Sequence, residues 1–288
     1  MSHIFSILMN LSTLVFVVTS MLVMGLSLTV TRIAAPLRNT HLVMTALAAN
    51  FILAPALAYG IGRLLSLSDG LRFGLIVVST AAGAPFLPRL TQLAKGDVAF
   101  SVGLMSLLVV VTIFYMPVVL PLLLRDVTVN PWEIARTLIL LMFLPLTLGL
   151  SINARYGQTA VVWAPYLAKA SDIALVSLLV SGLIANLSAI VKIIGTTGLL
   201  AALLFLLSCF VSGYLLGGRQ DAIRQVVALG TAQRNLAAAL AVATANFSED
   251  PAVIVMILVL GLVDLSVLLF TANLLGRRKN DPQPVGGT

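Results

Sequence analysis

The stretch Gly230-Thr-Ala-Gln-Arg-Asn235 interrupts an apolar segment with polar residues, and Ser79-Thr-Ala-Ala-Gly-Ala-Pro-Phe-Leu-Pro88 does the same in the first half of the chain. A helix broken within a bilayer frees backbone groups that have no water to bind. Such breaks therefore occur only where the backbone is buried in protein or lines a cavity. A pair of interrupted apolar segments in corresponding positions points to the binding site of a secondary transporter. The two stretches predict a carrier with two broken helices, and not an enzyme.

The composition places the chain in a membrane. Of its 288 residues, 60% are hydrophobic and 9% are charged, whereas about a quarter of the residues in a soluble domain are charged. The net charge of +7 comes mostly from residues in short loops, which indicates membrane topology and no nucleic-acid partner. Cys209 is the single cysteine, and His3 and His41 lie near segment ends. Neither a catalytic metal cluster nor a nucleophile with a paired base is therefore predicted.

Nine apolar stretches are long enough to cross the hydrocarbon layer, which takes about 20 helical residues. They cover residues 9–30, 42–64, 71–92, 98–124, 134–154, 165–190, 196–217, 222–246 and 251–275. The third and eighth contain the breaks. We expect spans 1–4 and 6–9 to form an inverted repeat whose two broken helices cross near the membrane mid-plane. Residues 1–276 then form one all-α transmembrane unit, and residues 277–288 form a disordered cytoplasmic tail.

Basic residues are distributed unevenly between the two sides of this topology. More Lys and Arg residues lie in the loops on the side of the C-terminus than on the other side. The positive-inside rule then predicts that the N-terminus is outside and the C-terminus is cytoplasmic. We also expect the protein to be integral to the plasma (inner) membrane. On the cytoplasmic side, Lys169 and Asp172 are three residues apart on one helix and are expected to pair.

Arg234 is the residue whose position demands an explanation, because it lies at the centre of the eighth span. A guanidinium group at that depth costs at least ~2.5 kcal/mol on insertion scales, so it must face the interior and have a partner. Asp264, at the centre of the ninth span, is the expected partner. The pair is either a structural ion pair or a functional one. In the functional case Arg234 meets an anionic substrate or stands in for a coupling cation, and Asp264 takes a proton when the pair opens.

Other polar residues complete the candidate site. Asn50 is a second intramembrane amide, five residues before Pro55, that either binds a ligand or joins two helices. Ser101 is a weaker candidate, because a helical serine can bond to its own backbone. Substrate- or ion-binding roles are expected for Asn50, Ser101, Thr231, Gln233, Arg234, Asn235 and Asp264, and roles in the backbone of the breaks for Gly83, Pro85, Pro88 and Gly230.

Three segments, Met24-Gly-Leu-Ser-Leu28, Asn50-Phe-Ile-Leu-Ala-Pro55 and Leu93-Ala-Lys-Gly-Asp-Val-Ala-Phe-Ser101, resemble segments of the bile acid:sodium symporter family. The likeness covers essentially the whole chain, and the third segment and the two breaks are its specific matches. It implies a core domain, residues 42–124 and 196–275, against which a panel domain of spans 9–30, 134–154 and 165–190 rocks. It also implies alternating access, a small organic anion as substrate, sodium as coupling ion and a lipid bilayer as surroundings.

The chain departs from the family's pattern at the positions that the resemblance assigns to sodium. A Ser-Asn pair after the first break is replaced by Leu87 and Pro88, the central glutamate falls on Gly230, and the neighbouring glutamine falls on Arg234. The site has lost a carboxylate and gained a cation, so we expect Arg234 to take the place of sodium. Transport is then sodium-independent or coupled to a proton on Asp264, with sodium symport as the family's default and no further cofactor. A channel or passive pore is the alternative class, although it would line its path with rings of polar residues.

Overall fold

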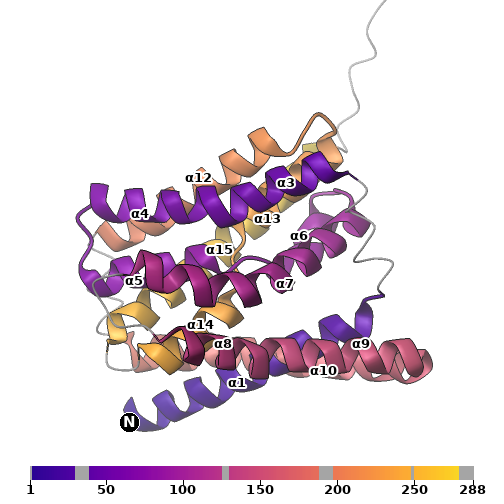
Figure 1. The fold of residues 1–288 in the computed structure, drawn as a ribbon, viewed down its shortest axis with the longest axis horizontal. Helices are drawn as coiled ribbons and strands as arrows, with labels where there is room; N and C mark the ends of the chain where they lie inside the picture. Colours follow the sequence, from indigo (N-terminus) through magenta and orange to yellow (C-terminus); the bar gives the residue numbers. More distant parts are fainter. Residues whose placement is uncertain (1, 30–38, 125–129, 188–196, 248–249, 279–288) are drawn as a thin grey trace, which may run out of the picture.

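The structure, a computed structural model, describes residues 2–29, 39–124, 130–187, 197–247 and 250–278. Within these ranges every regular element is a helix (Figure 1), which confirms the predicted all-α polytopic class. Eight of the described segments are long and apolar enough to cross a membrane. The expected span 71–92 is not among them, because it is divided into two short helices. Of the predicted tail 277–288, the first two residues continue the last helix, and the rest lie outside the described residues.

The helices form three layers (Figure 1). One outer layer contains α3, α4 and α12, the other contains α1, α8, α9 and α10, and the remaining helices lie between them. The bounds in chain order are α1 (Ser2–Ser27), α3 (Thr40–Ala48), the π-helical turn η2 (Ala49–Leu53), α4 (Ala54–Leu64), α5 (Asp69–Thr80), α6 (Leu87–Leu93), α7 (Val98–Leu123), α8 (Pro131–Leu138), the π-helical turn η3 (Ile139–Phe143), α9 (Leu144–Arg155), α10 (Gly157–Ala185), α12 (Thr197–Leu216), α13 (Asp221–Ala232), α14 (Leu236–Asn246) and α15 (Pro251–Arg278).

Close contact between two backbones joins α1 to α9. Gly25 of α1 faces the carbonyl oxygen of Leu146, and Gly149 of α9 faces the carbonyl oxygen of Leu22. A Cβ atom at either glycine would lie within 2.5 Å of these oxygens. Small residues at such crossings are the usual means of helix association in membranes, where an apolar side chain gains little by leaving lipid.

A π-helical turn, η2, interrupts the second transmembrane segment and contains Asn50, a residue of the candidate site. In a π turn the carbonyl group of residue i accepts from the N–H group of residue i+5. For Asn50 that residue is Pro55, which has no N–H group. Pro55 is also the residue at i+4 from Phe51, so it supplies a backbone donor to neither carbonyl. Tyr115 of α7 donates its hydroxyl group to the oxygen of Phe51, and the partner of Asn50 belongs to the site.

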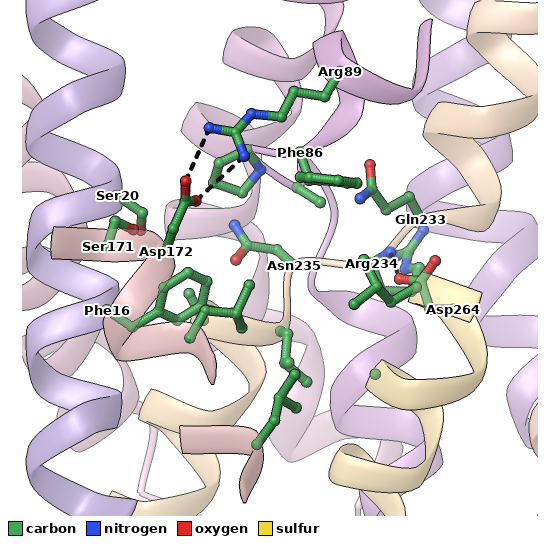
Figure 2. A pocket seen from close by; sticks show the side chains of 18 of the residues that line it. Phe16, Ser20, Phe86, Arg89, Ser171, Asp172, Gln233, Arg234, Asn235 and Asp264 are labelled. Atoms are coloured by element: carbon green, nitrogen blue, oxygen red, sulfur yellow. Dashed lines mark hydrogen bonds and ion pairs between the residues drawn. The ribbon is translucent and has the colours of Figure 1, made fainter. Parts of the chain in front are cut away.

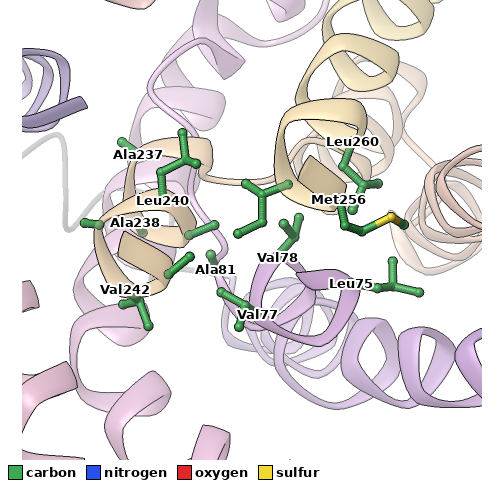
Figure 3. Close-up of a cluster of buried hydrophobic side chains, with 14 of the residues drawn as sticks. Leu75, Val77, Val78, Ala81, Ala237, Ala238, Leu240, Val242, Met256 and Leu260 are labelled. Carbon is green, nitrogen blue, oxygen red and sulfur yellow. The ribbon is translucent and has the colours of Figure 1, made fainter. Parts of the chain in front are cut away.

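The segment formed by α13 and α14 is almost entirely enclosed by protein. Figure 3 shows how alanines of α14 allow it to approach Val77, Val78 and Ala81 at the end of α5, while Met256 and Leu260 of α15 pack alongside. Alanine side chains leave little separation between the backbones. The chain between α13 and α14 is therefore held in the protein interior, where a broken helix is tolerated.

Candidate functional site

The two breaks lie against each other. The first comprises residues 81–86, between α5 and α6, and the second comprises residues 233–235, between α13 and α14. The backbone N–H of Asn235 donates to the carbonyl oxygen of Ala81 over 2.9 Å, and its Nδ2 donates to that of Gly83 over 3.1 Å. The Oδ1 atom of Asn235 accepts from the N–H of Ala238 and caps α14. Asn235 therefore joins the breaks and also begins the second half-helix.

Thr112 of α7 completes the hydrogen bonding of the first break. Its hydroxyl group accepts from the N–H of Ala82 and donates to the carbonyl oxygen of the same residue, both over 3.1 Å. Gly83 follows with a φ of +80°, and a Cβ atom there would lie 2.5 Å from the backbone nitrogen of Val109. Sequence reasoning missed Thr112. Its one signal was that it is the only threonine of a mostly apolar helix.

Arg234 is buried where the breaks meet, with 5% of its surface exposed. Its Nη1 atom donates to Oδ1 of Asn50 over 2.9 Å and to the carbonyl oxygen of Thr231 over 3.2 Å. Its Nη2 atom donates to the carbonyl oxygens of Ser79 and, over 3.4 Å, of Asn50. Its Nε atom donates to the carbonyl oxygen of Val78 over 3.3 Å. A guanidinium group has five N–H donors, so the five oxygens engage all of them.

These oxygens are available because of local structure. The carbonyl groups of Val78 and Ser79 lie in the last turn of α5, and that of Thr231 lies in the last turn of α13. Last-turn carbonyls lack the usual partner four residues on, and they form the negative end of the helix dipole; that of Val78 also accepts from the N–H of Ala81. Pro55 leaves the carbonyl oxygen of Asn50 free. Two helix C-termini and one π turn thus form an oxygen cage that suits a cation.

The structure does not form the ion pair predicted between Arg234 and Asp264. Oδ2 of Asp264 instead accepts from the backbone N–H of Arg234 over 3.2 Å. Oδ1 is buried and has no hydrogen-bond partner among the described residues. The guanidinium group bonds to the oxygen cage, which satisfies all five of its donors, whereas one carboxylate would satisfy two.

The other predicted binding residues fall into two groups. Thr231 belongs to the hydrogen-bonded cluster around Arg234, because its Oγ1 accepts from Nδ2 of Asn50 over 3.3 Å. Gln233 lines the adjoining pocket, and its Oε1 atom is buried without a described partner. Ser101 lies in the first turn of α7 and donates to the carbonyl oxygen of Val98, so it bonds to its own helix and not to the cluster.

The predicted backbone residues of the breaks also occupy separate places. Pro85 lines the pocket, and Pro88 lies in the first turn of α6, where a missing N–H group is tolerated. Gly230 of α13 packs against the side chain of Leu87, and a Cβ atom there would approach it to 3.0 Å. Gly230 is thus a packing residue within α13, and the break itself begins at Gln233.

A pocket of about 150 Å³ lies beside the two breaks (Figure 2). One wall comes from α1 and α10, and the other from the breaks and α15. Figure 2 shows Gln233, Arg234 and Asp264 together on one side, and Asp172 on the other. Apolar side chains such as Phe16 line much of the remaining surface. The pocket therefore suits a small molecule with both polar and apolar parts.

An ion pair connects the two walls at one edge of the pocket. Nη1 and Nη2 of Arg89, in α6, donate to Oδ1 and Oδ2 of Asp172, in α10, over 3.3 and 3.2 Å (Figure 2). Both side chains are 54% exposed, and an exposed pair of this kind contributes about 0–1 kcal/mol. The ring of Phe86 lies 5.6 Å from Cζ of Arg89. Asp172 thus pairs with Arg89, whereas the sequence predicted a pair between Asp172 and Lys169.

The comparisons with known proteins agree with this architecture. The family model described as the Sodium Bile acid symporter family matches residues 14–213. Two proteins of Oryza sativa subsp. japonica are similar to the chain. "Probable sodium/metabolite cotransporter BASS3, chloroplastic" is 25% identical over 195 residues, 67% of this chain and 46% of that protein. "Probable sodium/metabolite cotransporter BASS2, chloroplastic" is 27% identical over 200 residues, 68% of this chain and 47% of that protein.

The match has two limits. The chain spans about half the length of the curated relatives it matches. The second break, with Arg234, lies beyond the residues that the family model matches. The matched residues nevertheless include α3 to α10, most of α1 and of α12, and the whole of the first break. The chain therefore belongs to the sodium bile acid symporter family, a family of membrane transporters and not of enzymes.

Proposed function

We propose that this protein is a secondary carrier of small organic anions in which Arg234 takes the place of a coupling cation, so that transport does not require sodium. The observation that carries the proposal is the cage of five oxygen atoms around the guanidinium group. Unwound carbonyls and helix C-termini are the groups that bind Na⁺ in transporters with broken helices. Arginine keeps its charge at physiological pH, and its side chain is tethered, so it fills the cage permanently.

Helix ends around the site favour a cation in the cage and an anion beside it. α5 and α13 end at the cage, and their C-termini carry partial negative charge. α14 begins at Leu236, and its first turn lines the pocket with partial positive charge. The apolar side chains of Phe16 and Phe86 line the same pocket. We therefore expect an organic anion with a small apolar body.

The cycle that we propose moves the two walls of the pocket relative to each other. The panel would comprise residues 9–30, 134–154 and 165–190, and the core residues 42–124 and 196–275. Because the pocket lies between α1 and α10 on one side and the broken helices on the other, such a movement would expose it to each side of the membrane in turn. This is the alternating-access mechanism that the fold favours.

We further propose a plasma (inner) membrane location, and the loop charges support an orientation with the N-terminus outside and the C-terminus cytoplasmic. Gly276, near the end of α15, lies against the carbonyl oxygen of Leu93 at the end of α6. The edge of the pocket that contains Arg89 of α6 is therefore on the side to which the C-terminus runs. In this orientation that edge faces the cytoplasm.

A second version of the proposal uses a proton as the coupling ion. Asp264 lines the pocket, and its carboxyl group has one described hydrogen bond, from the backbone of Arg234. An isolated ionised carboxylate is costly to bury, so Asp264 is the group best placed to exchange a proton as the pocket opens. The alternative class, a channel, would place polar rings along a continuous path, and no observation favours it.

The test measures thermal unfolding of the purified protein in matched sodium and potassium salts at fixed pH and ionic strength. A ligand at a hundredfold excess over its dissociation constant stabilises the native state by about 2.7 kcal/mol, which the midpoint resolves. We expect equal midpoints, and equal uptake of labelled cholate and pyruvate into proteoliposomes in the two salts. A sodium-specific rise in the midpoint of the wild-type protein would overturn the proposal.

A further inference from the structure

The oxygen cage raises the question of which residue binds the anionic group of the substrate. Arg234 is the basic residue nearest the breaks, but all five of its N–H donors are engaged by protein oxygens. A substrate carboxylate could bind it only by taking its N–H groups from the cage, where all the oxygens except that of Val78, which also accepts from the N–H of Ala81, would then lack a described donor. Arg234 is therefore not available to the substrate. A different cation must serve that role.

Arg89 has the properties that this role requires. It lines the same pocket, and 54% of its side chain is exposed. Two of its five N–H donors, one on each Nη atom, are used by Asp172. The other three have no partner among the described residues. The ring of Phe86 lies beside the guanidinium group and restricts its orientation. A planar fork of this kind binds a carboxylate through two parallel hydrogen bonds.

We propose that Arg89 binds the anionic group of the substrate, and that Asp172 is an internal carboxylate that the substrate replaces. This inference rests on the proposed function in one respect, that the substrate is an organic anion. The exchange is chemically balanced, because one carboxylate takes the place of another on the same guanidinium group. Both side chains are half-exposed, so Asp172 is rehydrated when it leaves and is not stranded in an apolar interior.

The same exchange would connect binding to movement. Arg89 belongs to α6 and Asp172 to α10, so their ion pair joins the two walls of the pocket. The other ion pairs described between side chains, Arg72–Asp69 and Arg224–Asp221, each lie within one helix. When a substrate carboxylate binds Arg89, the link between α6 and α10 is released while the pocket is occupied. A carrier that opens only when loaded requires a contact of this kind.

The experiment compares two probes of nearly equal shape, 4-methylpentanoate and the neutral 4-methylpentanamide, by thermal unfolding of the full chain. We expect the carboxylate, and not the amide, to raise the midpoint. R89Q should weaken carboxylate binding on the order of tenfold or more, and R89K should fall between, because lysine keeps the charge but loses the fork. D172N should tighten binding, since it removes the competing carboxylate. R224Q, which removes the arginine of an ion pair outside the pocket, is the control and should bind like wild type.

Two outcomes would overturn the assignment. The first is carboxylate binding in R89Q that equals that of wild type. The second is the absence of any carboxylate-dependent shift in D172N, whose Arg89 has no internal competitor, when acetate and 4-methylpentanoate are both tried. Uptake separates this failure from failure of the proposed function. Anion uptake that continues in R89Q rejects Arg89 alone, whereas sodium-dependent uptake combined with loss of binding in R89Q rejects the sodium-independent carrier and keeps Arg89.

Discussion

The Nη1 atom of Arg234 lies 2.9 Å from the Oδ1 atom of Asn50, although the two residues are 184 positions apart in the chain. Asn50 also offers its carbonyl oxygen to Nη2, so one residue supplies two of the five oxygens around the guanidinium group. Pro55, five residues after Asn50, has no N–H group to compete with Nη2 for this carbonyl oxygen. The π turn in the second transmembrane segment thus supplies two oxygens to the guanidinium group of Arg234, which lies in the second break.

Replacement of Arg234 by glutamine should convert the cage into a sodium site. In R234Q the shorter side chain removes the positive charge and has two N–H donors in place of five, so oxygens of Asn50, Val78, Ser79 and Thr231 become available to Na⁺, a cation that such oxygens bind. We expect the unfolding midpoint of R234Q to be higher in sodium than in potassium. At a sodium concentration a hundredfold above its dissociation constant, the native state should gain about 2.7 kcal/mol of stability. Wild type and R224Q serve as controls. If R234Q is as stable as wild type in both salts, the oxygens do not act as a cation site.

Replacement of Asp264 by asparagine separates the two versions of the coupling. The amide oxygen of D264N can still accept from the backbone N–H of Arg234, but the side chain can no longer exchange a proton. We expect uptake of labelled pyruvate into proteoliposomes to respond to an imposed pH gradient in wild type and to lose that response in D264N, while exchange at equal pH continues. A wild-type carrier that ignores the gradient would eliminate the proton version.

Replacement of Thr112 by valine should destabilise the first break. The hydroxyl group satisfies both the N–H and the carbonyl group of Ala82, and valine has the same shape without either bond. Two buried backbone groups would lose their partners, at a cost of about 2 kcal/mol or more. The control is T19V, because Thr19 bonds to carbonyl oxygens of its own helix. Equal thermal midpoints for T112V and T19V would show that the break does not depend on the hydroxyl group.

Two Gly-to-Ala substitutions should change stability in opposite directions. Gly83 has a φ of +80°, and its neighbour is the backbone of Val109. G83A should therefore lose at least about 1 kcal/mol from the backbone conformation alone. Gly60 is helical, and its Cβ position meets open space. G60A should gain up to about 1 kcal/mol from helix propensity. The free energy of unfolding of both variants is measured by chemical or thermal unfolding. A G83A variant as stable as wild type would mean that the break readily moves away from Val109.

The sequence was sufficient for the helical class and the position of the breaks, because Gly, Pro and polar residues in apolar segments have a local physical meaning. It was not sufficient for the partners of Arg234. A central arginine and a central aspartate suggest a pair, but the outcome depends on carbonyl oxygens, which every residue has and no residue type reveals. Pro55, five residues after Asn50, was the available signal. The pairing of Arg89 with Asp172 was missed for another reason, because helix spacing predicts partners on one helix and not between helices.

The crossing of Gly25 and Gly149 has a mechanical consequence. Two backbones in direct contact have no layer of side chains between them that can change rotamer, so α1 and α9 behave as one rigid body. Movement that widens the pocket must then occur where long side chains meet the broken helices, as Phe16 and Leu175 do. The distance between α1 and α9 should therefore stay constant while other interhelical distances change. Spin labels on those two helices would report one distance in every conformation, whereas labels on α6 and α10 would report two.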